Sequence, residues 1–134
     1  MTDEEAIRQL FARFIHLRDD KRFDEWVELF TGNGRFEYGD NVMNGRVAIR
    51  DHVSALLHGD RGKHLCVNSI IEVDGDRATA SSDFVKMNPS AGPGRAPFEI
   101  GTMGRYEDDL VRQNGEWKIA WRRVVIAPSG DVGR

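Results

Sequence analysis

The sequence contains a single cysteine, Cys66, among its 134 residues, so an internal disulfide cannot stabilise the fold. It also lacks any apolar run approaching the roughly 18 residues that a transmembrane helix needs. The first ten residues, MTDEEAIRQL, are acidic, whereas a signal peptide starts with positive charge. These absences predict a reduced cytoplasmic protein with no membrane partner.

An excess of positive charge is missing as well. The chain has 19 Lys and Arg against 22 Asp and Glu, a net charge of −3, which gives no basic footprint for nucleic acid. No HExxH or CxxC pattern indicates a metal site, and we expect neither a metal nor a cofactor. With 40% hydrophobic and 31% charged residues, the composition is that of a soluble globular chain. A single domain spanning residues 1–134 can bury its own core.

The first part of the chain shows helical periodicity. Thr2 and Glu5 form a capping-box pattern, and the apolar residues that follow recur at helical spacing, which predicts a helix over 3–19. A second short helix is expected over 23–30 and a third over 47–57, with a short strand over 35–39 between them.

From residue 64 the apolar period changes to two. Strands are predicted over 64–73, 78–87, 98–111 and 117–126, with hairpin turns at Asp74-Gly75 and Asn114-Gly115. Residues 88–97 read as a loop and 128–134 as a frayed tail. Strict alternation in the first long strand places His64, Cys66, Asn68 and Ile70 on one face. The other face then carries Leu65, Val67, Ile71 and Val73, and we expect a homodimer through it.

Helices followed by a meander of long strands predict an α+β class, with the helices packed on a strongly curved antiparallel sheet. Twist closes such a sheet into a cone around an apolar pocket, a natural site for a small molecule.

Several separated motifs make the chain resemble the SnoaL-like branch of the NTF2-like superfamily. They are Leu17-Arg-Asp-Asp-Lys-Arg-Phe-Asp-Glu-Trp-Val-Glu-Leu-Phe30, Lys63-His-Leu-Cys-Val-Asn68, Gly104-Arg-Tyr-Glu-Asp and Gly115-Glu-Trp-Lys-Ile119. The resemblance covers nearly the whole chain and implies the NTF2-like cone with three N-terminal helices. The branch includes scytalone dehydratase, bile-acid dehydratase and a dehydrochlorinase, whose Asp–His pair is matched here by Asp19 and His64.

The resemblance also implies roles for individual side chains. His64 would act as general base, Asp19 would orient its ring, and Tyr38, which matches a pocket tyrosine, would polarise a carbonyl. Where the dehydratases carry a tyrosine on the first helix, this chain offers Phe14 or Arg18, and Ser82 stands where scytalone dehydratase has a second pocket histidine.

The remaining candidates allow more than one interpretation. Phe14, Cys66, Asn68 and Trp121 are expected to line the substrate pocket, although a core position is the alternative for Phe14 and Cys66. Asn68 could equally bond the adjacent backbone. Arg105, Arg122 and Arg123 are interpreted as solvated strand cations, with binding of a substrate carboxylate as the alternative.

Two classes of function follow. The first is a cofactor-independent lyase or isomerase, of dehydratase or cyclase type, that acts on a small apolar hydroxylated or carbonyl compound. The second is a non-catalytic module of the same fold that binds a small molecule or associates with another subunit, such as the small chain of ring-hydroxylating dioxygenases.

Overall fold

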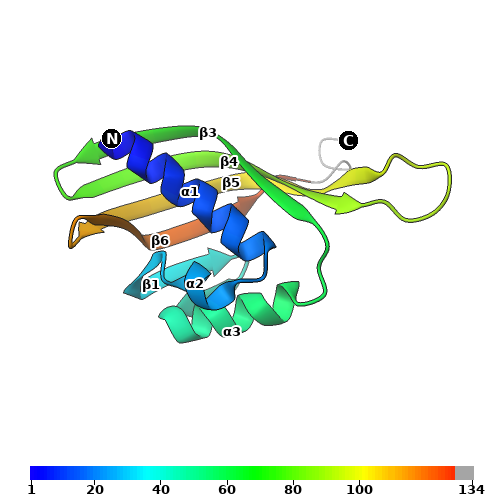
Figure 1. Ribbon diagram of the computed structural model, residues 1–134, viewed down its shortest axis with the longest axis horizontal. Helices are drawn as coiled ribbons and strands as arrows, with labels where there is room; N and C mark the ends of the chain where they lie inside the picture. Colours follow the sequence, from blue (N-terminus) through cyan, green and yellow to red (C-terminus); the bar gives the residue numbers. More distant parts are fainter. Residues whose placement is uncertain (129–134) are drawn as a thin grey trace.

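The structure is a computed structural model that describes residues 1–128, and helices cover one face of its curved sheet (Figure 1). Along the chain the elements are α1 (Asp3–Asp19), α2 (Phe23–Val27), β1 (Phe30–Tyr38), β2 (Asn41–Asn44), α3 (Arg46–Leu57), β3 (Lys63–Asp74), β4 (Arg77–Pro89), β5 (Phe98–Gln113) and β6 (Glu116–Ile126). The predicted α+β class is confirmed. The predicted tail 128–134 lies, apart from residue 128, outside the described residues.

The sheet has the order β2-β1-β6-β5-β4-β3. The meander predicted for the second half of the chain is present as β3 to β6, joined by antiparallel pairings. The sheet is mixed rather than wholly antiparallel, because β1 pairs in parallel with β6. The short strand β2, which the sequence did not predict, adds an antiparallel edge to β1.

The second helix is shorter than predicted. It ends at Val27, and strand β1 begins at Phe30 instead of residue 35. The sequence prediction took Leu29 and Phe30 as a continuation of the helical stripe, because a short apolar run fits both periods. Pairing with β6 decides the conformation: the amide of Ile119 donates to the carbonyl of Leu29 at 2.9 Å.

Helix α1 begins as the sequence predicts. Thr2 and Glu5 form both hydrogen bonds of the capping box, at 3.0 and 3.1 Å. Its buried stripe packs on the sheet, where Phe14 lies in a cluster of aromatic rings whose other members are Trp26, Phe30, Phe36 and Tyr106. This packing places the last turn of α1 beside the start of β3, where Asp19 contacts His64.

A β-bulge in β3 corrects the predicted faces of that strand. Asn68 has a φ of 56°, and the pairing of β3 with β4 shifts register between Val67 and Ile70. The bulge reverses the alternation beyond it, so Ile71 and Val73 pack against the core and Ile70 is exposed. The prediction that Ile71 and Val73 lie on the outer face was therefore wrong, while Leu65 and Val67 are exposed as expected.

Strand β5 requires glycine at position 104, within the Gly-Arg-Tyr motif. A Cβ atom there would clash with the carbonyl oxygen of Val125 and lie 2.9 Å from Cε1 of Phe84. The close approach allows the ring of Phe84 to stack on Tyr106, with centroids 4.6 Å apart. None of the helices within residues 1–128 is long and apolar enough to cross a membrane.

Candidate active site

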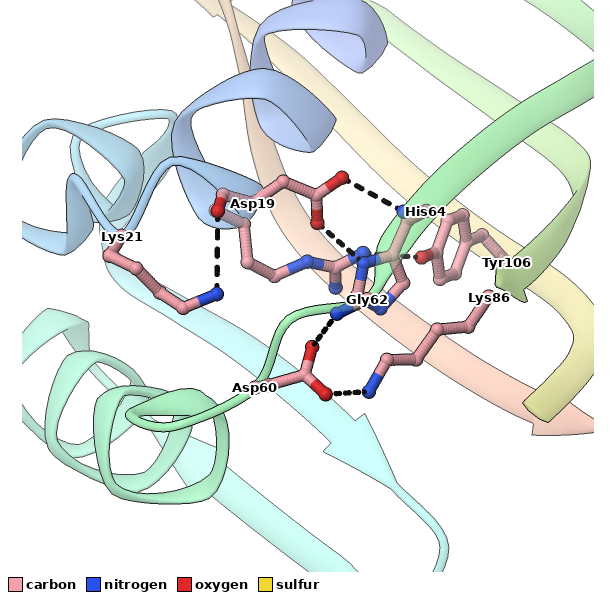
Figure 2. A network of polar contacts seen from close by, with 8 residues as sticks. Asp19, Lys21, Asp60, Gly62, His64, Lys86 and Tyr106 are labelled. Atoms are coloured by element: carbon pink, nitrogen blue, oxygen red, sulfur yellow. Dashed lines mark hydrogen bonds and ion pairs between the residues drawn. The ribbon is translucent and has the colours of Figure 1, made fainter. Parts of the chain in front are cut away.

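The structure brings Asp19 and His64 into direct contact. Asp19 is the last residue of α1 and His64 is the second residue of β3 (Figure 2). Nδ1 of the imidazole lies 2.6 Å from Oδ1 of Asp19, and the backbone amide of His64 donates to Oδ2 at 2.8 Å. Strand β3 is the edge of the sheet, so its outward amide at this position has no strand partner and Asp19 satisfies it.

Both side chains of this pair are shielded from water, each being 8% exposed. Burial lowers the pKa of His64 below its ordinary value of 6.5 and the charge of Arg18 adds to this, while the hydrogen bond to Asp19 opposes it. Burial raises the pKa of Asp19, but the hydrogen bonds from the ring and backbone of His64 outweigh it, and the net pKa is lowered. At neutral pH the pair is therefore a carboxylate and a neutral imidazole.

This charge state fixes the tautomer of the ring. A carboxylate can only accept a hydrogen bond, so Nδ1 of His64 carries the hydrogen that is donated to Asp19. The other ring nitrogen, Nε2, keeps a free lone pair. His64 thus has the form that a general base requires.

A cavity of about 180 Å³ lies beside His64, enclosed by α1, α3 and the strands. Its wall combines the polar side chains of Arg18, Tyr38, His52, His64, Lys86 and Thr102 with the apolar side chains of Phe36, Met43, Val53, Leu56 and Leu57. Within residues 1–128, no group of three or more His, Cys, Asp or Glu side chains is arranged to hold a metal ion.

A second hollow, a groove of about 630 Å³, lies on the other side of the pair between α1 and β3. Its wall includes Asp19, His64, Cys66 and Asn68. Asn68 donates through its side-chain amide to Oδ2 of Asp83 at 3.1 Å, on the neighbouring strand β4. His64 lines both the groove and the cavity, so its side chain lies in the wall between them.

Of the other predicted site residues, some line the cavity beside His64 and others lie elsewhere. Tyr38 lines the same cavity as His64. Phe14 is fully buried in the aromatic cluster and does not line it. Trp121 is 36% exposed and lies against the guanidinium of Arg35 on the outer face of the sheet, so the prediction that it forms a wall of this pocket was wrong. Ser82 is buried and its hydroxyl lies 2.7 Å from that of Ser69.

A further ion pair at the cavity was missed by the sequence analysis. Lys86 of β4 donates to Oδ1 of Asp60 at 2.7 Å, and the other oxygen of Asp60 accepts from the amide of Gly62 at 3.2 Å (Figure 2). Asp60 lies three residues before the start of β3, so these bonds fix the position of the segment that leads into β3 and His64. No motif connects the two residues, because 26 positions separate them in the sequence.

The strand cations also need correction. Arg122 was interpreted as solvated, but it is fully buried and pairs with both oxygens of Asp108 at 2.6 and 2.7 Å. Its guanidinium lies over the rings of Phe11, Phe14 and Tyr106 at 4.9, 4.3 and 4.1 Å. No sequence pattern indicated this: strict alternation from Trp117 and Ile119 would turn Arg122 outward, and the irregularity after Ile119 in the pairing of β6 with β5 turns it inward.

Comparisons with known proteins agree with this architecture. The SnoaL-like domain family matches residues 1–123. Rv2910c, an uncharacterised protein of Mycobacterium tuberculosis, is 31% identical over 127 residues, covering 92% of this chain and 84% of that protein. Mb2934c, an uncharacterised protein of Mycobacterium bovis, matches with the same identity and coverage.

Two solved structures show the same fold. A variant of Rv3472, a protein of unknown function from Mycobacterium tuberculosis, superposes with a TM-score of 0.88 at 33% identity, covering 96% of this chain and 74% of that one. An NTF2-like protein with a cystatin-like fold from Novosphingobium aromaticivorans gives a TM-score of 0.82 at 24% identity, covering 96% of this chain and 85% of that one.

Proposed function

This chain belongs to the SnoaL-like domain family, and from that premise we propose that it is a cofactor-independent lyase or isomerase acting on a small hydroxylated or carbonyl compound. The observation that carries the proposal is the contact between Asp19 and His64 at the wall of a cavity. A buried, neutral imidazole held by a carboxylate is suited to general acid–base chemistry.

The proposed first step is removal of a proton from the carbon next to a carbonyl group. Nε2 of His64 takes the proton, the electrons of the C–H bond form an enolate, and Asp19 stabilises the resulting imidazolium. Tyr38 lines the same cavity and would donate its hydroxyl hydrogen to the enolate oxygen. A well-aligned donor of this kind stabilises a transition state by about 2–4 kcal/mol.

The second step returns the proton and regenerates the neutral ring. In a dehydration, the enolate electrons expel the hydroxyl group on the next carbon while the imidazolium protonates it, so that water and a conjugated enone are released. In an isomerisation, the imidazolium gives the proton back to a different carbon. Both routes use only the groups of the chain and of the substrate, without a redox partner.

A direct test uses a panel of small ketones with and without a β-hydroxyl group, beginning with 3-hydroxycyclohexanone and cyclohexanone. Dehydration is followed by the ultraviolet absorption of the enone, and proton abstraction by exchange of the α-hydrogens in D₂O observed by NMR. We expect the wild type to accelerate at least one reaction and His64→Gln to lose about 10²–10⁴-fold of that rate. His16→Gln, which replaces an exposed histidine of α1, is the matched control and should retain it.

The opposite result would assign the second class of function. If wild type and His64→Gln react at the same rate over the whole panel, the catalytic proposal fails. The chain is then a binding or association module of the same fold.

A further inference from the structure

The guanidinium of Arg18 is a buried cation at the wall of the His64 cavity. The side chain lies one residue before Asp19 in the last turn of α1 and is 5% exposed. Its Nη2 donates to the hydroxyl of Tyr106 at 3.0 Å, whereas its Nε has no hydrogen-bond partner. Buried N–H groups are rarely left unpaired, because a buried donor without an acceptor is energetically costly.

The charges around Arg18 do not supply its missing partner. Asp60 is paired with Lys86, and Asp108 with Arg122. The carboxylate of Asp19 interacts electrostatically with Arg18 but accepts its two hydrogen bonds from His64, and no carboxylate of the described residues forms an ion pair with Arg18. The remaining close neighbour is the ring of Phe14, 4.7 Å from the guanidinium carbon.

A guanidinium stays protonated even when buried, so Arg18 cannot remove its charge by losing a proton. A buried charge without a directly paired carboxylate is unfavourable, and a ligand that brought one would bind with part of that penalty relieved. The charge-assisted bond between a guanidinium N–H and an oxyanion is also among the stronger hydrogen bonds available to a protein.

We propose that the cavity takes a monocyclic carboxylate, with its carboxylate on the guanidinium of Arg18 and its ring against the apolar wall. The volume of about 180 Å³ sets the size, since a cavity of about 150 Å³ holds one benzene ring. Phe36, Met43, Val53 and Leu57 supply the apolar wall. This inference rests on the proposed function in assigning the same cavity as the reaction site, and it narrows the substrate to a small acid.

Benzoate and its neutral analogue benzamide are suitable probes, because they differ in charge but hardly in shape. Titration calorimetry of the wild type should give a dissociation constant for benzoate at least tenfold lower than for benzamide. The NMR resonances of the Arg18 guanidinium, assigned through Arg18→Lys, should shift with benzoate and stay unchanged with benzamide. Equal affinities, unchanged guanidinium resonances or no binding of benzoate would each overturn the proposal.

Variants separate the charge of Arg18 from its structural bond. Arg18→Met should lose the preference for benzoate while still binding benzamide. Tyr106→Phe removes the hydrogen bond to Nη2 but keeps the cation, so it is the matched control and should keep the preference. If Arg18→Met fails to fold, Arg18→Lys is measured instead. Its preference for benzoate over benzamide should be at least threefold smaller than that of the wild type.

The experiment also distinguishes this inference from the catalytic proposal. Binding of benzoate on Arg18 without His64-dependent turnover of any ketone in the panel would keep the anion site and reject the catalysis. Turnover that depends on His64, together with equal binding of benzoate and benzamide, would support the catalytic proposal and reject the anion site.

Discussion

A single carboxylate, that of Asp19, accepts hydrogen bonds from both the backbone amide and the imidazole ring of His64, at 2.8 and 2.6 Å. The first bond fixes the start of β3 against the end of α1, and the second fixes the rotation and tautomer of the ring. Position and protonation of the proposed base therefore depend on one side chain, which lies 45 residues earlier in the sequence.

Asp19→Asn should change the titration of His64 in a defined direction. The carboxylate opposes the lowering of the His64 pKa, so its removal should lower that pKa further. Long-range ¹H–¹⁵N NMR, with the signal assigned through His64→Gln, should also show hydrogen on Nδ1 in the wild type at pH 7. A ring that titrates like a free imidazole and ignores Asp19→Asn would contradict the dyad.

The stability of the fold should fall on mild acidification. The folded pKa of His64 lies below 6.5, so the unfolded chain takes up a proton first as the pH drops. The contribution of His64 to the free energy of unfolding is fully present above about pH 6.5. It decreases as the pH falls from there to the lower pKa of the folded state, by at most about 1.4 kcal/mol per pH unit. The lowered pKa of Asp19 adds a second loss below pH 3.8, the ordinary value for that group.

Urea denaturation at several pH values measures this slope. His64→Gln should flatten the profile just below pH 6.5, while His16→Gln, at an exposed position, should leave the profile as in the wild type. A profile that is flat already in the wild type would show that the ring is not buried in its neutral form.

The buried pair of Arg122 and Asp108 should be intolerant of a change to one partner. Asp108→Asn leaves a guanidinium inside the core with its ring contacts but without its counter-ion, and should lower the free energy of unfolding by about 3–5 kcal/mol. Replacing both residues, as Arg122→Met with Asp108→Leu, should recover much of that loss. Asp83→Asn, at an exposed pair with Arg105, is the control and should have little effect.

The outer face of the sheet should pair with a second copy of the chain. Leu65, Val67, Ile70, Ile100, Met103 and Val125 are each at least 43% exposed on β3, β5 and β6. Light scattering should therefore give twice the chain mass of 15.2 kDa, and Ile70→Lys should shift it to the monomer. A wild-type mass near 15.2 kDa at micromolar concentration would refute this pairing.

Local patterns in the sequence were sufficient for much of the architecture. The capping box of Thr2 and Glu5, the apolar stripe of α1 and the hairpin turns after β3 and β5 each depend on residues close together in the chain. For that reason the bounds of α1, α3 and the long strands were predicted to within a few residues. Asp19 and His64 were identified through the family resemblance, since neither stands in a pattern that marks a site by itself.

Tertiary structure decided the features that depend on distant partners. Phe30 was predicted to be helical but lies in β1, because it pairs in parallel with β6. The bulge at Asn68 reversed the faces of β3, because one extra residue shifts a period of two. The sequence likewise did not determine the environment of three side chains, those of Arg18, Arg122 and Trp121. Whether a charged or aromatic side chain is buried depends on neighbours that only the folded chain brings together.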